Sequence, residues 1–283
     1  MVVKLGLAYL NRGGAADPGF AAEIAIAGEE AGYDSVWASD HVAVPEGLAA
    51  LSPNQADPRT PEGPGRRLFV DPFVFLSYLA AHTSRLLLAT GVLVLPLRHP
   101  LLTAKAVSSL DHMSGGRAVL GVGVGWLEAE FRLLDADFAA RGRTTDRDLA
   151  LLRELWAAES FTPVPGERWT MEPRPPTGRV RIVVGGGTPR AAARAVAHGD
   201  GFFVSGGRAF ELIDRTRSLL GAHGRDQAGF EITMKAPMDP AGLRAATRAD
   251  RLLVPVVRGS DLAVCAGRPE DLAGLAERIH GLG

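Results

Sequence analysis

The stretch RLLLATGVLVLPLRHPLLTAKAVSSLDHMSGGRAVLGVGV, residues 85–124, contains the pattern on which the fold depends. It begins with a nearly continuous apolar run, 85–95, which is typical of a strand buried on both faces of a parallel sheet. A helix-periodic segment, 99–113, follows and ends at Ser-Gly-Gly, and a second apolar strand occupies 117–124. The order strand, helix, strand predicts two parallel strands joined by a helix.

The same alternation extends in both directions along the chain. Further strands are predicted at 3–9, 34–39, 180–184, 201–204, 229–235 and 250–257, and further helices at 19–32, 71–82, 126–138, 144–158, 188–198, 208–223, 240–248 and 269–280. Eight strands alternating with helices, without a break in composition, favour an α/β fold with one closed (β/α)8 barrel, a TIM barrel, over residues 1–283. An open doubly wound sheet stays the alternative, because periodicity does not show closure.

Three segments carry local predictions of their own. Residues 42–68, rich in Pro and Gly, form a long loop after the second strand, which is typical of a lid or a disordered segment. Residues 160–178 contain five prolines and predict a loop or a small hairpin. The pattern Thr145-x-x-Asp148 predicts a capping box at the start of helix 144–158.

Composition excludes several classes of protein. Of the 283 residues, 46% are hydrophobic and 22% are charged, and the net charge is −1, so there is no overall basic field for nucleic acid or an anionic membrane surface. Cys265 is the single cysteine, which excludes an internal disulfide and a Cys-rich zinc site. No apolar run reaches about 18 residues and no signal-peptide core is visible, so we expect a soluble, cytoplasmic protein.

One histidine stands where barrel enzymes place catalytic groups. These groups lie at the carboxyl ends of the strands, and His41 alone follows a strand end directly, in Ser39-Asp40-His41. An ionised Asp40 is an acceptor, and histidine is the side chain type whose charge is easiest to change near neutral pH, so the pair suits cofactor anchoring and proton transfer. The structural alternative is that Asp40 caps the loop and His41 packs on it.

Glycine runs follow three other strands, and each has a functional and a structural interpretation. Residues 185–189, Gly-Gly-Gly-Thr-Pro before a helix, suit an anion site or a tight turn. Residues 121–125, with alternating glycines, suit a flat ligand close to the backbone or tight packing inside the barrel. Gly91, within an otherwise bulky strand, predicts a β-bulge.

Metal chemistry is not indicated, because the chain has no HxH or HExxH pattern and few acidic residues at strand ends. Lys235, at the end of the seventh strand, could form a Schiff base, as in a lyase. The alternative is a solvated or phosphate-pairing lysine.

Four stretches together carry a family resemblance: residues 31–41, 88–92, 117–126 and 183–188. In this order and at these strand positions they resemble the luciferase-like monooxygenase superfamily, in particular its branch that uses the deazaflavin coenzyme F420. The likeness covers about residues 3–205 well and the rest of the chain only loosely.

The resemblance implies a barrel that binds a flavin-like ring and transfers a hydride between the deazaflavin and a substrate carbon. Asp40 and His41 would lie beside the ring, with His41 exchanging the accompanying proton. Thr90 and a cis peptide between Gly91 and Val92 would support the ring. The remaining implied cofactor residues are Gly123 and Gly125 at the ring, and Gly185, Gly186, Gly187 and Thr188 at the phosphate of the tail.

The chain departs from the sugar-phosphate dehydrogenases of that branch at one position. An acidic residue follows the Gly-x-Gly run there, whereas this chain has Trp126, which suggests a more apolar pocket. Trp126 and Tyr9 are therefore the candidate substrate-pocket residues, with helix core as the alternative for Trp126. The expected partner is a small-molecule substrate, and the resemblance is compatible with a homodimer.

Two functions compete with an F420-dependent oxidoreductase, besides the lyase that Lys235 suggests. One is an FMN-dependent monooxygenase of the same superfamily, for which FMN replaces F420 as the cofactor. The other is a non-catalytic protein that binds flavin or F420.

Overall fold

The structure is a computed structural model that describes residues 3–45, 68–237, 240–256 and 266–281. Most of the predicted lid, 42–68, and the single cysteine at 265 therefore lie outside the described residues.

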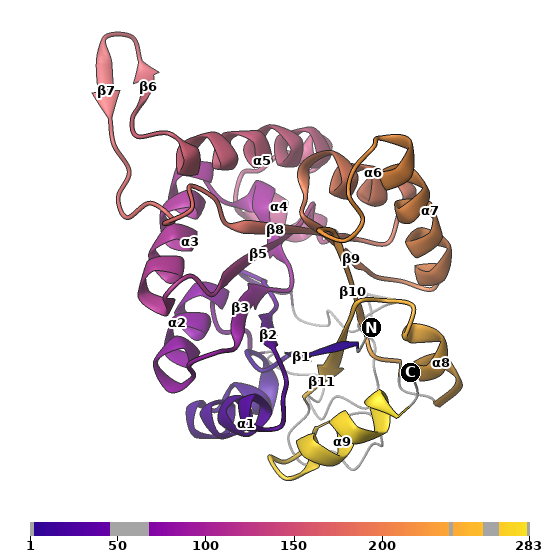
Figure 1. The fold of residues 1–283 in the computed structure, drawn as a ribbon. Coiled ribbons are helices and arrows are strands. Elements are labelled where there is room, and N and C mark those ends of the chain that lie inside the picture. Colours follow the sequence, from indigo (N-terminus) through magenta and orange to yellow (C-terminus); the bar gives the residue numbers. More distant parts are fainter. Residues whose placement is uncertain (1–2, 46–67, 238–239, 257–265, 282–283) are drawn as a thin grey trace.

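Eight parallel strands form a closed ring (Figure 1): β1 Lys4–Ala8, β2 Ser35–Ala38, β3 Leu87–Thr90, β5 Ala118–Gly123, β8 Arg181–Gly186, β9 Gly201–Val204, β10 Glu231–Lys235 and β11 Arg251–Pro255. Each strand pairs with the next one named, and β1 pairs with β11, so the ring has no open edge among these strands. The closed barrel confirms the predicted fold class and excludes the open sheet. That residues 1–283 form a single domain stays a prediction.

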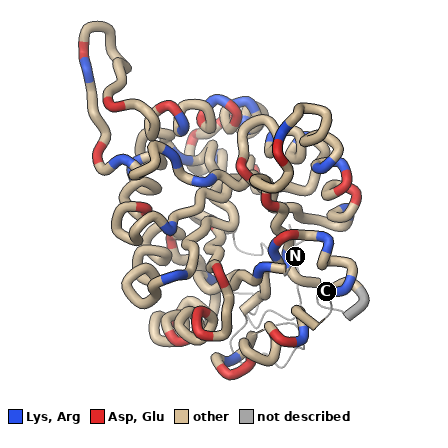
Figure 2. The backbone as a smooth tube through the Cα atoms, in the orientation of Figure 1, with Lys and Arg blue, Asp and Glu red and all other residues tan. Residues whose placement is uncertain are grey.

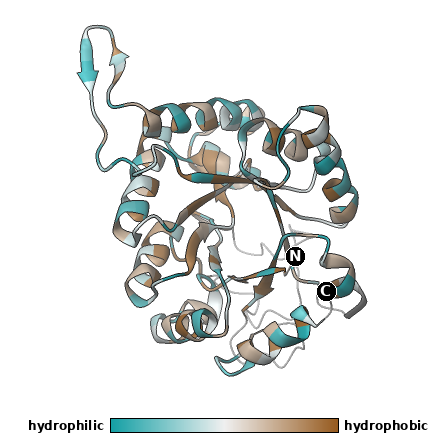
Figure 3. Cartoon of the chain, in the orientation of Figure 1, coloured by the Kyte–Doolittle hydropathy of each residue, from teal (hydrophilic) through white to brown (hydrophobic). Residues whose placement is uncertain are grey.

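Helices surround the ring: α1 Pro18–Glu30, α2 Pro72–His82, α3 Pro100–Ser114, α4 Glu128–Leu133, α5 Arg141–Ala157, α6 Pro189–His198, α7 Ala209–Ala222, α8 Pro240–Ala246 and α9 Asp271–His280. Several begin at a proline that follows a capping side chain, as at Asp17, Asp71 and Thr188, each of which accepts a hydrogen bond from a backbone N–H of its helix. Figure 3 shows the apolar strands inside this outer layer. Within the described part, no helix is long and apolar enough to cross a membrane.

Two apolar clusters hold these layers together. The larger fills the space between the sheet and the helices, and the smaller lies inside the barrel around Trp37 and Leu253. The interior is narrow, and glycine makes room for its largest side chain: a Cβ atom at Gly6 would lie 3.2 Å from the Trp37 ring, and one at Gly91 would lie 3.3 Å from it.

The amino end of the barrel is closed by charged side chains. Arg251 Nε lies 2.8 Å from Glu231, Lys4 Nζ also lies 2.8 Å from Glu231, and Arg251 contacts Asp34. Burial lowers the pKa of Arg251 to about 10. Because this end is filled by the chain's own ion pairs, the opposite, carboxyl end of the strands is left for a functional site.

The predicted strand 85–95 is interrupted in the structure. It ends at Thr90, passes a cis peptide bond between Gly91 and Val92, and resumes as the short strand β4, Leu93–Val94, which pairs with β5. The bulge predicted at this glycine and the cis peptide implied by the resemblance are both present.

Two helix predictions were wrong at their ends. The segment 126–138 contains only α4, because the chain turns at Asp135, whose φ is 52°. The predicted capping box does not form: α5 begins at Arg141, so Thr145 lies inside the helix and donates a hydrogen bond to the carbonyl of Arg141 at 2.8 Å.

The proline-rich segment 160–178 contains a hairpin. Its strands, β6 Phe161–Val164 and β7 Glu167–Trp169, pair with each other and project away from the barrel (Figure 1). Apart from the half-buried Phe161, every residue of these two strands is exposed.

Candidate active site

A buried asparagine fixes the end of β2. The side-chain amide of Asn11 donates to the carbonyls of Ser39 at 2.7 Å and Val70 at 2.8 Å, and its oxygen accepts from the N–H of Ser39 at 2.9 Å. Asn11 is fully buried. The chain after β1 and the chain before α2 therefore hold in place the segment that leads into Asp40 and His41.

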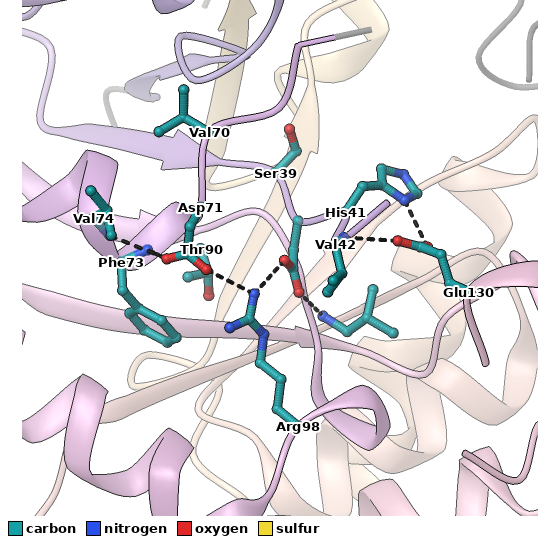
Figure 4. Close-up of polar contacts among 12 residues, drawn as sticks. Ser39, His41, Val42, Val70, Asp71, Phe73, Val74, Thr90, Arg98 and Glu130 are labelled. Atoms are coloured by element: carbon teal, nitrogen blue, oxygen red, sulfur yellow. Dashed lines mark hydrogen bonds and ion pairs between the residues drawn. The ribbon is translucent and has the colours of Figure 1, made fainter. Parts of the chain in front are cut away.

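Asp40 connects three elements beneath the carboxyl end of the barrel. One carboxylate oxygen accepts from the N–H of Val94 at 3.0 Å, and the other lies 2.8 Å from Arg98, which also reaches Asp71 at the start of α2 (Figure 4). Burial alone would lower the pKa of Arg98, but the two carboxylates raise it above its ordinary value. Asp40 is itself buried, so this geometry gives it a positioning role, and its predicted contact with a cofactor stays a prediction.

His41 is held by a carboxylate that the sequence analysis did not identify. Its Nδ1 lies 2.8 Å from Glu130 of α4, whose other oxygen accepts from the N–H of Val42 at 2.8 Å (Figure 4). The same oxygen also accepts from the N–H of Ala43 at 3.3 Å. The side chains of His41 and Glu130 are only 6% and 3% exposed. When neutral His41 donates its Nδ1 proton to Glu130, Nε2 is left as an acceptor. No described residue makes a hydrogen bond to this Nε2.

Aromatic rings enclose the imidazole of His41. Phe69 lies edge-on with ring centroids 4.9 Å apart, and Trp126 lies edge-on at 6.0 Å. Trp126 is 41% exposed, so it is not part of a helix core. The placement beside His41 agrees with the predicted substrate pocket without testing it.

The bulge residue Val92 explains two of the predicted glycines. A Cβ atom at Gly123 would lie 2.7 Å from one methyl group of Val92, and a Cβ atom at Gly185 would lie 2.7 Å from the other. Real Cβ atoms do not approach so closely, so both glycines make room for Val92. The structure thus brings together the bulge at 91–92 and the ends of β5 and β8, and the contacts of these residues with a cofactor stay predictions.

Two further residues that were predicted to contact the cofactor make contacts within the protein. The hydroxyl of Thr90 is buried and donates to the carbonyl of Gly121 at 2.6 Å, which joins β3 to β5. Gly125 has a φ of 80°, and a Cβ atom there would lie 2.6 Å from Phe131. Their contacts with a ring stay predictions.

The turn between β8 and α6 is the candidate anion site. Gly186 has a φ of 154°, a Cβ atom at Gly187 would lie 2.6 Å from the carbonyl of Ser205, and the hydroxyl of Thr188 accepts from the N–H of Ala191 at 3.2 Å. Internal packing therefore accounts for these glycines. Gly187 and Thr188 are nevertheless exposed, so the positive end of α6 faces solvent and suits an anionic group.

Tyr9 lies across the ring of strands from the turn between β8 and α6. It follows β1, has a φ of 73°, and carries Arg12 and Lys235 over its ring, at 3.6 Å and 4.7 Å from the centroid.

Among the described residues, no group of three His, Cys, Asp or Glu side chains is arranged to hold a metal ion.

These residues fit an anionic ring cofactor in two respects: an exposed helix start for a phosphate, and a buried imidazole with a free acceptor beside a partly exposed tryptophan. Sequence reasoning missed Glu130, Arg98 and Asn11. The only signal for them was a polar side chain on a segment that follows a strand end, which many solvated residues share.

Comparisons with known proteins identify relatives of this chain. The family model of luciferase-like monooxygenases matches residues 4–278. An uncharacterized protein of Mycobacterium tuberculosis is 33% identical over 226 residues, 74% of each chain. The F420-dependent glucose-6-phosphate dehydrogenase of Kineococcus radiotolerans is 28% identical over 279 residues, 93% of this chain and 76% of that protein.

Solved structures share the fold. The monooxygenase RslO1 of Streptomyces bottropensis superposes with a TM-score of 0.68 at 21% identity, with 98% of each chain covered. An F420-dependent secondary alcohol dehydrogenase in complex with an F420–acetone adduct superposes with a TM-score of 0.65 at 19% identity, with 88% of this chain and 74% of that chain covered. Because the family model matches almost the whole length of this chain, the chain belongs to the luciferase-like monooxygenase family.

Proposed function

We propose that the protein is an oxidoreductase that uses coenzyme F420 and transfers a hydride between the deazaflavin and a small organic substrate. The observation that carries this proposal is the buried His41–Glu130 pair at the carboxyl end of the barrel, 2.8 Å apart, in a chain of this family. The likeness to F420-dependent glucose-6-phosphate dehydrogenases supports the choice of cofactor.

When bound, F420 supplies the carbon that accepts or donates the hydride. The chain supplies orientation and a site for the proton. Glu130 accepts from His41 Nδ1, which fixes the ring and leaves Nε2 to take the proton released by the substrate or to return it in the reverse direction. The exposed start of α6 is the part of this chain that would hold the phosphate of the cofactor tail.

A second candidate is an FMN-dependent monooxygenase of the same family. It is favoured by the likeness to a monooxygenase structure over 98% of both chains. His41 and the start of α6 serve either cofactor, so cofactor preference separates the two candidates.

Binding titrations of the purified protein with F420 and FMN, side by side, test the proposal. We expect F420 to bind in the micromolar range or tighter and FMN at least tenfold more weakly. Tighter binding of FMN would replace the proposal with the second candidate, and binding of neither would contradict both.

The role of His41 has its own test. His41→Ala should keep the affinity for the cofactor and lose turnover by about 10²- to 10⁴-fold, the range typical of a general acid–base group. Turnover at the wild-type rate would remove His41 from the mechanism.

We also propose, alongside this function, a small-molecule substrate, a homodimeric assembly and a cytoplasmic location.

A further inference from the structure

Two cationic side chains share one aromatic ring at the carboxyl end of the barrel. The guanidinium carbon of Arg12 lies 3.6 Å from the centroid of the Tyr9 ring, and Lys235 Nζ lies 4.7 Å from it. The two charges are therefore no farther apart than the sum of these distances. Lys235 is exposed and Arg12 is half-buried, so a ligand in solvent can reach them.

Neither cation has an anionic partner among the described residues. No carboxylate pairs with Arg12 or Lys235 in the described part of the chain, although arginines elsewhere are paired, such as Arg98 with Asp40 and Arg251 with Glu231. Two like charges near one another repel, and the negative face of Tyr9 offsets only part of that repulsion. An anion bound between the two cations would remove the repulsion.

The backbone of Tyr9 is itself unusual. Its φ of 73° lies in the left-handed region, which a bulky side chain rarely adopts. Such conformations persist where the surrounding structure enforces them, and they concentrate at ligand sites. Here the buried Asn11, two residues later, is fixed to Ser39 and Val70, which holds this part of the chain after β1 in place.

The closed ring places this cluster across from the glycine-lined side. The strands follow one another as β1, β2, β3, β5, β8, β9, β10 and β11, so strands four steps apart face each other. Lys235, at the end of β10, is opposite the bulge after β3. Tyr9, after β1, is opposite β8 and its glycine turn.

We propose that Arg12 and Lys235, held against Tyr9, form an anion-binding subsite for the substrate, and that the substrate carries a carboxylate or a phosphate. The assignment to substrate rests on the proposed function, because it gives the opposite side of the rim to the cofactor. The anion site itself does not depend on that function. Arg12 offers a planar fork and Lys235 a point charge, a combination that suits anionic oxygens.

Calorimetric titration of the cofactor-free protein with inorganic phosphate and with acetate, at low ionic strength, tests the site. Arg12→Gln and Lys235→Met each remove one charge at nearly constant length, and we expect each to weaken binding of the preferred anion at least tenfold. Arg215→Gln is the matched control, because Arg215 is exposed within α7, outside both proposed anion sites, and should leave this binding within twofold. Unchanged binding in both variants, or no binding of either anion to the wild type, overturns the proposal.

A second titration assigns the anion to substrate or to cofactor. In protein saturated with F420, phosphate or acetate should still bind, and the affinity for F420 should be the same in Arg12→Gln and Lys235→Met as in the wild type. Loss of anion binding on loading, or a tenfold weaker affinity for F420 in the variants, would give the site to the cofactor tail and overturn the substrate assignment. If F420 does not bind at all, the proposed function fails, while the first titration still decides the anion site.

Discussion

Glu130 determines how His41 can act, because one carboxylate fixes both the imidazole and the backbone that follows it. One of its oxygens lies 2.8 Å from Nδ1 of His41, and the other accepts from the N–H of Val42 at 2.8 Å. Removing the charge while keeping the shape should therefore disturb proton transfer more than binding.

We expect Glu130→Gln to bind the cofactor with unchanged affinity and to lose about 10- to 100-fold in kcat, since a neutral amide supports a charged imidazole less well. The solvent isotope effect on kcat should rise as proton transfer becomes rate-limiting. Glu128→Gln, an exposed glutamate on the same helix, is the control and should match the wild type. Equal kcat values in the two variants would contradict a positioning role for Glu130.

At the residue scale, only part of the site can be predicted from the sequence. His41 could be chosen from seven histidines because it alone follows a strand end directly. Glu130 could not be separated from Glu128, because both lie on one short helix and only the contact of that helix with residues 41–43, after β2, buries one of them. The partners of Asp40 were equally hidden, since Val94 and Arg98 reach it through a bulge and a turn.

Among the elements, α1 is tied to the start of β3 by one carboxylate. Glu29, the residue before the end of α1, accepts from the N–H groups of Ser84 at 3.1 Å, Arg85 at 2.5 Å and Leu86 at 2.8 Å. Burial alone would raise the pKa of Glu29, but these hydrogen bonds outweigh it and lower the pKa from 4.5 to about 2.

The lowered pKa fixes the sign of a pH effect. The stability that ionised Glu29 contributes is fully present above pH 4.5 and is lost as the pH falls from 4.5 towards 2. Glu29→Gln should lower the free energy of unfolding by about 1–2 kcal/mol at pH 7, after allowance for solvent screening. Urea unfolding at several pH values should show this difference shrinking below pH 4.5, with Glu23→Gln, exposed on the same helix, as the control. A difference that persists unchanged at pH 3 would contradict the assignment.

Element types were predicted better than element ends. The alternation of strands and helices followed from periodicity and from prolines at helix starts, whereas the break at Gly91 within β3–β4 depends on contacts with β5 and β8. The start of α5 was misplaced because Asp137, rather than Thr145, binds the preceding turn, where it accepts from the N–H of Ala140 at 3.0 Å.

At the scale of the whole molecule, the hairpin projects away from the barrel. The strands β6 and β7 pair only with each other, and nearly all of their residues are exposed. Figure 2 shows charged residues of both signs along this arm, which is typical of a solvated segment.

Replacing residues 162–168 by Asn-Gly should join Phe161 to Trp169, which pair with each other, through a two-residue turn. We expect the free energy of unfolding to change by less than about 1 kcal/mol, as is usual for surface changes, and cofactor binding to be unaffected. Gly121→Ala is the contrasting variant, because its Cβ would lie 1.9 Å from the carbonyl of Thr90 and should prevent normal folding. A large loss of stability on trimming would show that the arm is buried against a second copy, which light scattering of both proteins would detect.

Closure of the barrel is the part of the fold that the sequence favoured without showing. Eight strand–helix units predicted it, and the pairing of β1 with β11 established it, because closure depends on the tilt and stagger of all the strands together.

Val92 packs between Gly123 and Gly185, so substitutions at these three distant positions depend on one another during evolution. A lineage that gains a methyl group at either glycine must first reduce the side chain at position 92, so the order in which such changes accumulate is constrained. A valine there, once established, preserves both glycines whether or not a ligand ever touches them.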